Sequence, residues 1–141
     1  MPARTGSATW EGTLKGGKGT MKLGSGAYEG PFSFLSRFES GTGTNPEELI
    51  GAALAGCFSM ALSAQLGNAG MTAESIATTA TVNLEKTDAG FTITAVHLDV
   101  TAKIPGADKA AFDTAANNAK AGCPVSRVLN ATITMNATLE A

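Results

Sequence analysis

The sequence predicts an α+β protein in which antiparallel strands curl around one long buried helix. Three observations lead to this fold class. The first third of the chain alternates short strand-like segments with glycine turns, a helix-start signal then introduces an uncharged run over 49–66, and two longer strand-like segments follow. With 141 residues, 43% of them hydrophobic, the chain is expected to form a single domain over residues 1–141.

Charge and composition argue against several classes of partner and location. Ten Lys and Arg residues against twelve Asp and Glu residues, with no basic run, argue against nucleic acid and anionic membranes as partners. The first residues lack the apolar segment of a signal peptide, so we expect a cytoplasmic protein, in which structural disulfides are rare. The run over 49–66 approaches the length of a membrane span, but its Ala, Gly and Ser content favours a buried helix of a soluble protein.

The N-terminal strands are expected at Ser7–Trp10, Thr20–Leu23 and Ala27–Phe34, paired as an antiparallel meander. Glycine-rich turns separate them. One of these turns, Gly12–Gly19, resembles a phosphate-binding loop, but it lacks the final Ser or Thr and lies between strands rather than before a helix. We therefore interpret it as a hairpin turn.

The central helix has a clear start signal. Asn45 is the expected N-cap, Pro46 fits the first helical position, and Glu48 fits the capping-box position. Gly67 is the expected stop.

The interior of this helix has no charged face, so we expect neighbours to cover it all round. Gly51 and Gly56 lie inside it, and each glycine costs about 1 kcal/mol of helix propensity relative to alanine. Close approach of another element at these positions would offset that cost.

The C-terminal half predicts a hairpin, two helices and a final strand. Strands are expected at Ile76–Leu84 and Phe91–Ile104, and the alternation of the second strand changes parity near Ala95, which predicts a β-bulge there. A helix follows, a shorter helix begins after Cys123, and Ala131–Leu139 closes the chain as a strand. The first of these helices carries one apolar stripe, formed by Ala111, Phe112, Ala115, Ala116 and Ala119.

The candidate reactive residues are two cysteines and one arginine. Cys57 lies inside the apolar helix, where burial raises a thiol pKa, whereas Cys123 lies at a helix start, where free N–H groups favour the thiolate. Arg37 is flanked by hydrophobic residues, and a buried guanidinium needs an acidic partner such as Glu47. Brought beside Cys57, that guanidinium would hold the thiol as a thiolate. His97, the only histidine, is expected on the polar side of its strand, and we expect no metal site.

Four segments carry a specific combination of motifs. They run from Arg37 to Glu39, from Gly43 to Ala53, from Ala55 to Leu62 and from Lys120 to Ser126. Together they resemble the OsmC/Ohr family of osmotically inducible and organic hydroperoxide resistance proteins, and shorter matches extend the resemblance nearly end to end. The chain is more similar to the OsmC branch than to the Ohr branch.

The resemblance implies an intertwined homodimer with the OsmC-like fold, acting as a thiol-dependent peroxidase in oxidative and osmotic stress defence. Cys57 matches the peroxidatic cysteine, Cys123 the resolving cysteine, Arg37 the activating arginine and Glu47 its carboxylate partner. The implied chemistry passes through a sulfenic acid on Cys57 and a Cys57–Cys123 disulfide. No cofactor is implied, and the implied reductant is an external dithiol, either lipoamide or a lipoylated protein.

Apolar residues near these positions indicate the class of hydroperoxide. Phe34, Phe38, Phe58 and Met60 would suit an alkyl chain, so we expect organic hydroperoxides to react faster than hydrogen peroxide.

The spacing of Glu47 and Cys57 adds a geometric expectation. Ten residues on one helix separate them by roughly 15 Å along the axis, so they do not share a site within one subunit. We therefore expect Arg37 and Glu47 of one chain to serve Cys57 of the other.

Two further interpretations stay open: a non-catalytic thiol redox sensor or stress-induced binding dimer, and a purely structural dimer with inert cysteines.

Overall fold

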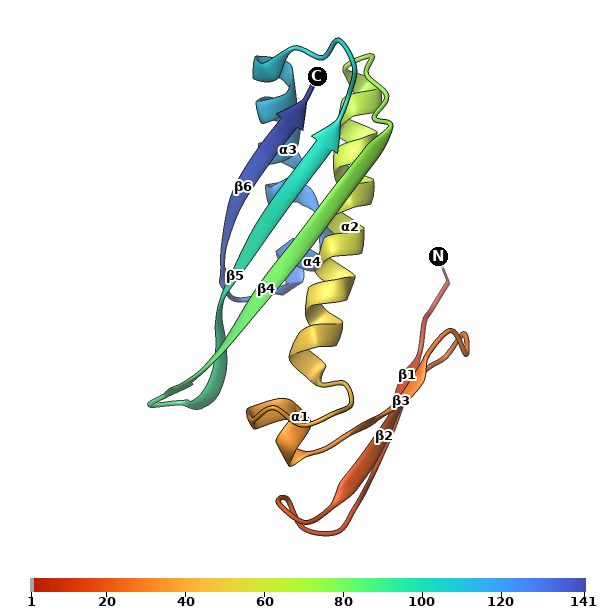
Figure 1. Cartoon of the computed structure of the whole chain (residues 1–141), viewed down its shortest axis with the longest axis vertical. Helices are drawn as coiled ribbons and strands as arrows, with labels where there is room; N and C mark the ends of the chain where they lie inside the picture. The colour runs from red at the N-terminus through yellow and green to blue at the C-terminus, as the bar shows by residue number, and fades with distance from the viewer. Residues whose placement is uncertain (1) are drawn as a thin grey trace. The chain divides into compact units, whose positions relative to one another are not determined.

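Three N-terminal strands form a small antiparallel sheet. In the computed structural model, which describes residues 2–141, β1 (Gly6–Glu11), β2 (Lys18–Leu23) and β3 (Glu29–Phe32) pair in the order β1-β2-β3 (Figure 1). The glycine-rich stretch after Glu11 connects β1 to β2, as expected for a hairpin turn.

Gly19 allows two aromatic rings to pack across this sheet. It lies opposite both Trp10 and Phe32, whose ring centroids are 5.3 Å apart. A Cβ atom at Gly19 would lie 2.5 Å from the Phe32 ring and 2.7 Å from the Trp10 ring. Glycine at this position is therefore a packing requirement rather than a turn signal.

A short helix, α1 (Phe34–Phe38), follows β3, where the sequence predicted a strand reaching Phe34. The strand prediction is wrong at this end because Ser33 caps the helix. The Ser33 backbone N–H donates to Ser36 Oγ at 2.8 Å, and the Ser36 backbone N–H donates to Ser33 Oγ at 3.2 Å. Two serines replace the usual Ser and Glu of a capping box, so the sequence does not show the familiar pattern.

The long helix α2 (Pro46–Asn68) begins as predicted, because the Glu48 backbone N–H donates to Asn45 Oδ1 at 2.7 Å. It ends later than predicted, since Gly67 is still helical and the left-handed glycine that follows it is Gly70, with φ of +79°. The chain divides into two compact units between residues 49 and 50, so α2 starts in the first unit and continues in the second. The single domain over residues 1–141 stays a prediction.

The second unit contains a long hairpin with the predicted bulge. β4 (Ser75–Thr87) and β5 (Gly90–Lys103) are antiparallel. Asn83 pairs with Ala95 and the next residue of β4 pairs with Ile93, so the register skips one residue of β5. This irregularity lies where the apolar alternation changes parity.

The last strand, β6 (Thr132–Glu140), pairs with β5 in parallel. The prediction of a purely antiparallel arrangement is therefore wrong at this strand. Between β5 and β6 the chain passes through α3 (Lys109–Gly122) and α4 (Pro124–Val128), and a helical crossover of this kind returns the chain in the same direction.

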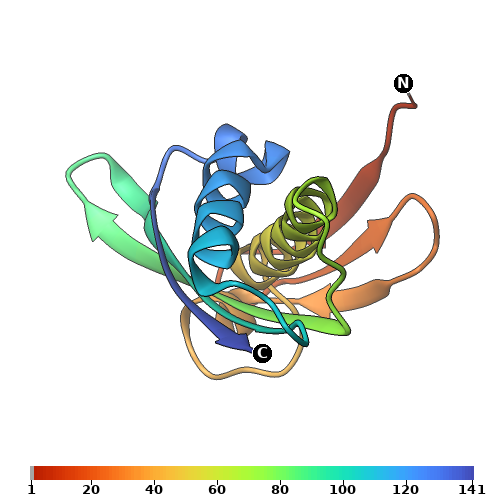
Figure 2. The same cartoon turned by 90° about the horizontal axis from the view of Figure 1, so that it is seen from above.

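The core of the second unit lies between one face of the β4-β5-β6 sheet and two helices. Figure 2 shows α2 and α3 side by side on that face. Most of the predicted stripe of α3 is buried, and α2 contributes buried residues four positions apart. The fully buried apolar residues of the two helices include Leu54, Phe58, Leu62, Leu66, Phe112 and Ala116.

The opposite face of α2 is exposed, so the prediction that this helix is covered all round is wrong for the single chain. Ala52, Ala53 and Gly56 are exposed, and Met60 is 78% exposed. Gly51 does approach β4, where an added Cβ would lie 3.3 Å from the Ala80 carbonyl oxygen, but Gly56 has no such neighbour within 4 Å. By length and composition α2 could also cross a membrane, with a mean hydropathy of 1.7, although core helices of soluble proteins pass the same test.

The outer face of the β4-β5-β6 sheet is polar and carries the histidine. His97 Nδ1 lies 2.6 Å from Thr134 Oγ1, and His97 Nε2 lies 3.3 Å from Asp99 Oδ1. The predicted placement of His97 on the polar side of its strand is confirmed.

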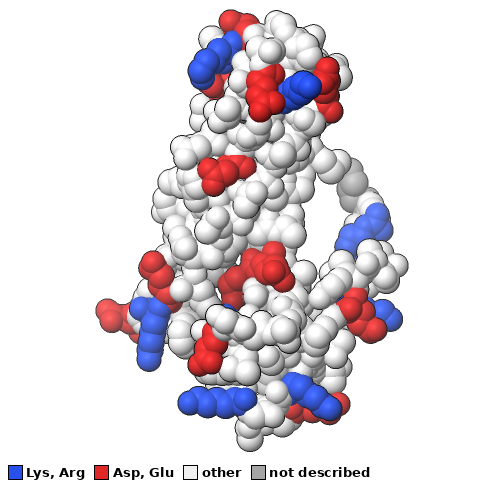
Figure 3. Space-filling view, viewed as in Figure 1, with Lys and Arg blue, Asp and Glu red and all other residues white. Residues whose placement is uncertain are grey.

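On the face of the molecule shown in Figure 3, basic and acidic side chains are interspersed, and no continuous basic stripe crosses the described residues there.

Candidate active site

Arg37 and Glu47 form a two-point ion pair in the N-terminal unit. Arg37 Nε lies 3.1 Å from Glu47 Oε1, and Arg37 Nη2 lies 3.4 Å from Glu47 Oε2. Glu47 is buried, whereas 39% of the Arg37 side chain is exposed. A forked pairing of this kind fixes the plane of the guanidinium, so Arg37 is held in one orientation and is still accessible.

Polar contacts between α1 and the start of α2 hold this pair in place. Ser36 Oγ donates to the Thr44 carbonyl oxygen at 2.7 Å, and Asn45 Nδ2 donates to the Ser36 carbonyl oxygen at 2.9 Å. Thr44 Oγ1 donates to Glu48 Oε2 at 2.8 Å. Glu48 is thus engaged by Thr44, and of the two adjacent glutamates it is Glu47 that pairs with Arg37, as the sequence predicted.

Two of the predicted substrate-contacting residues lie beside this ion pair. The rings of Phe34 and Phe38 have centroids 5.1 Å apart on α1, and the Arg37 guanidinium carbon lies 5.2 Å from the Phe38 centroid. The short helix therefore places an apolar surface next to an accessible cation.

Cys57 and Cys123 come together in the second unit, although they are 66 residues apart in sequence. Their Sγ atoms are 2.6 Å apart, and both cysteines are free thiols. Cys57 lies on α2, while Cys123 ends α3 and begins α4. Cys123 is fully buried and Cys57 is partly exposed, so the two sulfur atoms differ in their access to solvent.

The two thiols have opposite pKa shifts. Burial, together with the hydrogen bond to Cys123, raises the pKa of Cys57. Burial also opposes ionisation of Cys123, but hydrogen bonds from Cys57 and from the Ser126 backbone outweigh it and lower the pKa of Cys123. Both directions agree with the sequence-based expectation. Within one chain, negative charge on the pair is therefore favoured at Cys123.

The other two predicted substrate-contacting residues lie on different faces of α2. Phe58 is fully buried in the hydrophobic core of the second unit, whereas Met60 is 78% exposed on the uncovered face. A single chain does not bring these two side chains together. An apolar run without periodicity does not reveal such a difference, because every face of the helix has the same character.

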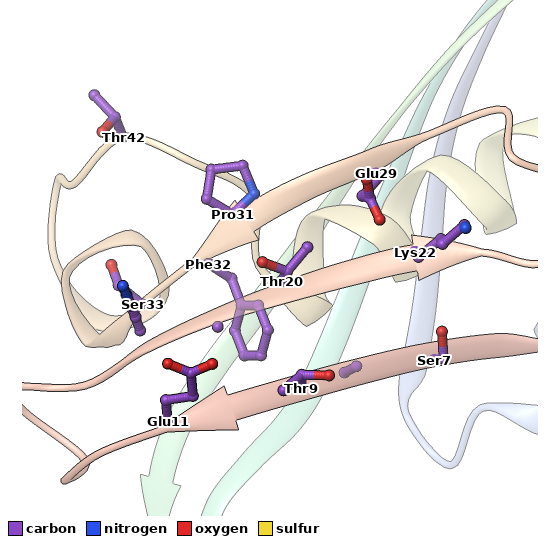
Figure 4. Close-up of a pocket in the computed structure, with 13 residues that line it drawn as sticks. Ser7, Thr9, Glu11, Thr20, Lys22, Glu29, Pro31, Phe32, Ser33 and Thr42 are labelled. Atoms are coloured by element: carbon purple, nitrogen blue, oxygen red, sulfur yellow. The ribbon is translucent and has the colours of Figure 1, made fainter.

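A hollow of about 630 Å³ lies on one face of the N-terminal sheet and contains none of the predicted reactive residues. Residues of all three strands line it, among them Thr9, Thr20 and Pro31 (Figure 4). Over residues 2–141, no group of three or more His, Cys, Asp or Glu side chains is placed to hold a metal ion.

Comparison with known proteins places these residues in a family. A family model described as OsmC-like protein matches residues 39–138, more than half of the chain. The chain belongs to the OsmC family. It is 55% identical over 134 residues to Peroxiredoxin OsmC of Escherichia coli (strain K12), covering 94% of each chain.

Solved structures of OsmC and Ohr proteins share this fold. An OsmC-like protein of unknown function from Vibrio cholerae covers 97% of this chain and 99% of its own, with 16% identity and a TM-score of 0.78. The organic hydroperoxide resistance protein OhrB of Bacillus subtilis covers 95% of this chain and 98% of its own, with 21% identity and a TM-score of 0.70. The predicted α+β fold of the OsmC type is confirmed.

One residue beside the cysteine pair has no counterpart among the sequence-based candidates. Ser126 lies three residues after Cys123 and is 8% exposed, and its backbone N–H and hydroxyl favour the thiolate form of Cys123 by lowering its pKa. The signal in the sequence is its position as the third residue of a helix capped by a cysteine.

Proposed function

We propose that this OsmC family member is a thiol-dependent peroxidase that reduces organic hydroperoxides in the cytoplasm, in oxidative and osmotic stress defence. The observation that carries the proposal is the 2.6 Å approach of two free cysteines, Cys57 and Cys123. The name of the 55% identical relative, a peroxiredoxin, supports the same class of enzyme. A reactive thiol pair of this kind is typical of compartments that keep cysteines reduced.

The chemistry that fits these residues has two oxidation steps. The Cys57 thiolate attacks one peroxide oxygen, the O–O bond breaks, and an alkoxide leaves with the electron pair. Cys57 becomes a sulfenic acid, which condenses with the Cys123 thiol to form a disulfide and water. An external dithiol, lipoamide or a lipoylated protein in this proposal, then reduces the disulfide and is itself oxidised.

Arg37 fits the role of activating Cys57 from the partner chain of a homodimer. Within one chain burial raises the pKa of Cys57, so a cation beside this thiol is what the reaction requires. α2 is continuous from Glu47 to Cys57, which separates the two by roughly 15 Å along the helix axis. The exposed apolar face of α2 is a surface that a second copy would cover. The proposed site therefore combines Arg37 and Glu47 of one chain with Cys57 and Cys123 of the other.

The proposal is tested by stopped-flow kinetics with dihydrolipoamide as reductant. Cumene hydroperoxide is expected to oxidise Cys57 at least about tenfold faster than hydrogen peroxide, since an apolar site gains binding free energy from the organic group. Equal or reversed rate constants would contradict the preference for organic substrates. Oxidation without turnover by dithiols would favour a redox sensor instead.

Glu47→Gln is expected to lower the rate constant for peroxide reduction by about 10-fold to 100-fold, because a neutral amide no longer fixes the Arg37 fork. Glu48→Gln is the matched control, since Glu48 is engaged by Thr44 rather than by Arg37. The measurement is the rate constant of each variant with cumene hydroperoxide. An equal loss in both variants would show that the ion pair has no specific part in the reaction.

A further inference from the structure

Ser126 is a buried serine beside the cysteine pair, and its hydroxyl forms no hydrogen bond in the dithiol state. Ser126 is 8% exposed, and within residues 2–141 its Oγ is the one buried side-chain oxygen or nitrogen without a hydrogen-bond partner. Leaving a buried hydroxyl unsatisfied costs roughly 1–3 kcal/mol. A buried hydroxyl that is retained at this cost in free energy indicates a role in another state of the protein.

Ser126 occupies the position in α4 from which a side chain can reach back to the N-cap residue, Cys123. Cys123 is the N-cap residue, Ser126 is the third helical residue, and the Arg127 backbone N–H closes the turn on the Cys123 carbonyl oxygen at 3.0 Å. The side chain of a third helical residue faces the N-cap residue, as in a capping box. The Cys123 side chain makes no capping hydrogen bond of its own, so its sulfur can accept one.

The effect on ionisation agrees with this placement. Burial alone would raise the pKa of Cys123, but the Cys57 thiol and the backbone N–H and hydroxyl of Ser126 lower it, because each can donate to the sulfur once it is charged. The Ser126 hydroxyl, which makes no hydrogen bond in the dithiol state, thus gains an acceptor once the Cys123 sulfur carries negative charge.

Access decides which sulfur of a Cys57–Cys123 disulfide a reductant can reach. Cys123 is fully buried and Cys57 is partly exposed, so an incoming thiolate reaches the Cys57 sulfur. The sulfur that must then leave is Cys123, which is the one beside Ser126.

We propose that Ser126 donates a hydrogen bond to the Cys123 sulfur as it leaves during reduction of the disulfide, which speeds that step. This role rests on the proposed function. One thiolate of the external dithiol attacks Cys57 Sγ, the S–S bond breaks, and its electron pair passes to Cys123 Sγ. The second thiol of the reductant then displaces Cys57 from the mixed disulfide, so the dithiol ends as a disulfide and both cysteines end reduced. The two protons that the dithiol gives up end on the two cysteines, exchanged through water.

The test separates reduction from peroxide chemistry. The disulfide is formed with diamide, which needs no peroxidase activity, and its reduction by dihydrolipoamide is followed in a stopped-flow instrument. Ser126→Ala is expected to slow reduction about tenfold, the loss typical of one hydrogen bond to a charged group. Ser59→Ala is the matched control, because it removes a hydroxyl that is bonded to Thr78 at 2.7 Å, and it is expected to reduce at the wild-type rate.

Two further measurements exclude a merely structural role. Ser126→Thr and Ser126→Val differ by a hydroxyl at similar volume, and only the Thr variant is expected to reduce at a near wild-type rate, which also decides the question if the Ala variant fails to fold. In a Cys57→Ser background, thiolate absorbance at 240 nm is expected to titrate at higher pH when Ser126 is replaced by Ala. Equal reduction rates for Thr and Val, with an unchanged titration, would overturn the role of Ser126. Failure of the proposed peroxidase would appear separately, as no oxidation by hydroperoxide.

Discussion

Cys57→Ser is expected to abolish hydroperoxide consumption, with a loss of at least about 10³-fold in rate, because a serine hydroxyl is not ionised near neutral pH and does not displace an alkoxide. Cys123→Ser is expected to react once with hydroperoxide and then to stop. Its Cys57 sulfenic acid has no neighbouring thiol to condense with, because the substitution removes the sulfur atom that lies 2.6 Å from Cys57 Sγ in the native protein. Further peroxide should oxidise it to a sulfinic acid.

Stopped-flow consumption of cumene hydroperoxide, followed by mass spectrometry of the two cysteine peptides, measures both variants. The result that would reverse the assignment is full activity in Cys57→Ser with loss in Cys123→Ser. That outcome would have a physical basis, because within one chain hydrogen bonds lower the pKa of Cys123 despite its burial. If neither variant changes peroxide consumption, the cysteines are structural.

Mixing inactive Arg37→Ala chains with inactive Cys57→Ser chains is expected to restore activity. If Arg37 of one chain serves Cys57 of the other, each heterodimer has one site with both residues intact and one site with neither. Random pairing of equal amounts makes about half of the dimers mixed, so about a quarter of the wild-type activity returns. The measurement is peroxide consumption after the two variants are unfolded together and refolded.

The reciprocal mixture provides the control. Chains carrying both Arg37→Ala and Cys57→Ser are mixed with wild-type chains, and each resulting heterodimer then has no intact site if the sites are shared. If the sites lie within single chains, the first mixture stays inactive and the second keeps one active site per heterodimer. With random pairing, shared sites give about a quarter of the wild-type activity in both mixtures, whereas sites within single chains give none in the first mixture and about half in the second.

Local signals in the sequence predicted much of the fold because short-range physics determines those features. Asn45 caps α2 through a contact three residues away, and the parity change near Ala95 predicts the bulge in β5. The Ser33–Ser36 cap of α1 escaped prediction because serine pairs are common in loops and strands as well. The parallel direction of β6 depends on how the helical crossover packs, and no local pattern encodes that direction.

The reactive residues of this OsmC family member can be identified from its amino-acid sequence. The motifs around Cys57 and Cys123, the cap at Asn45 and the acidic residues after it are all local, so they are readable without a structure. The sequence also predicted the directions of both thiol pKa shifts, although the largest effect that lowers the pKa of Cys123 comes from Cys57, 66 residues away in sequence.

How closely these residues approach one another depends on the folded chain. The 2.6 Å approach of the two sulfur atoms and the burial of Ser126 depend on contacts between separate elements. The uniform apolar run of α2 likewise concealed one buried face and one exposed face. When every face of a helix is apolar, its buried face and its exposed face are distinguished only by which side the other elements pack against.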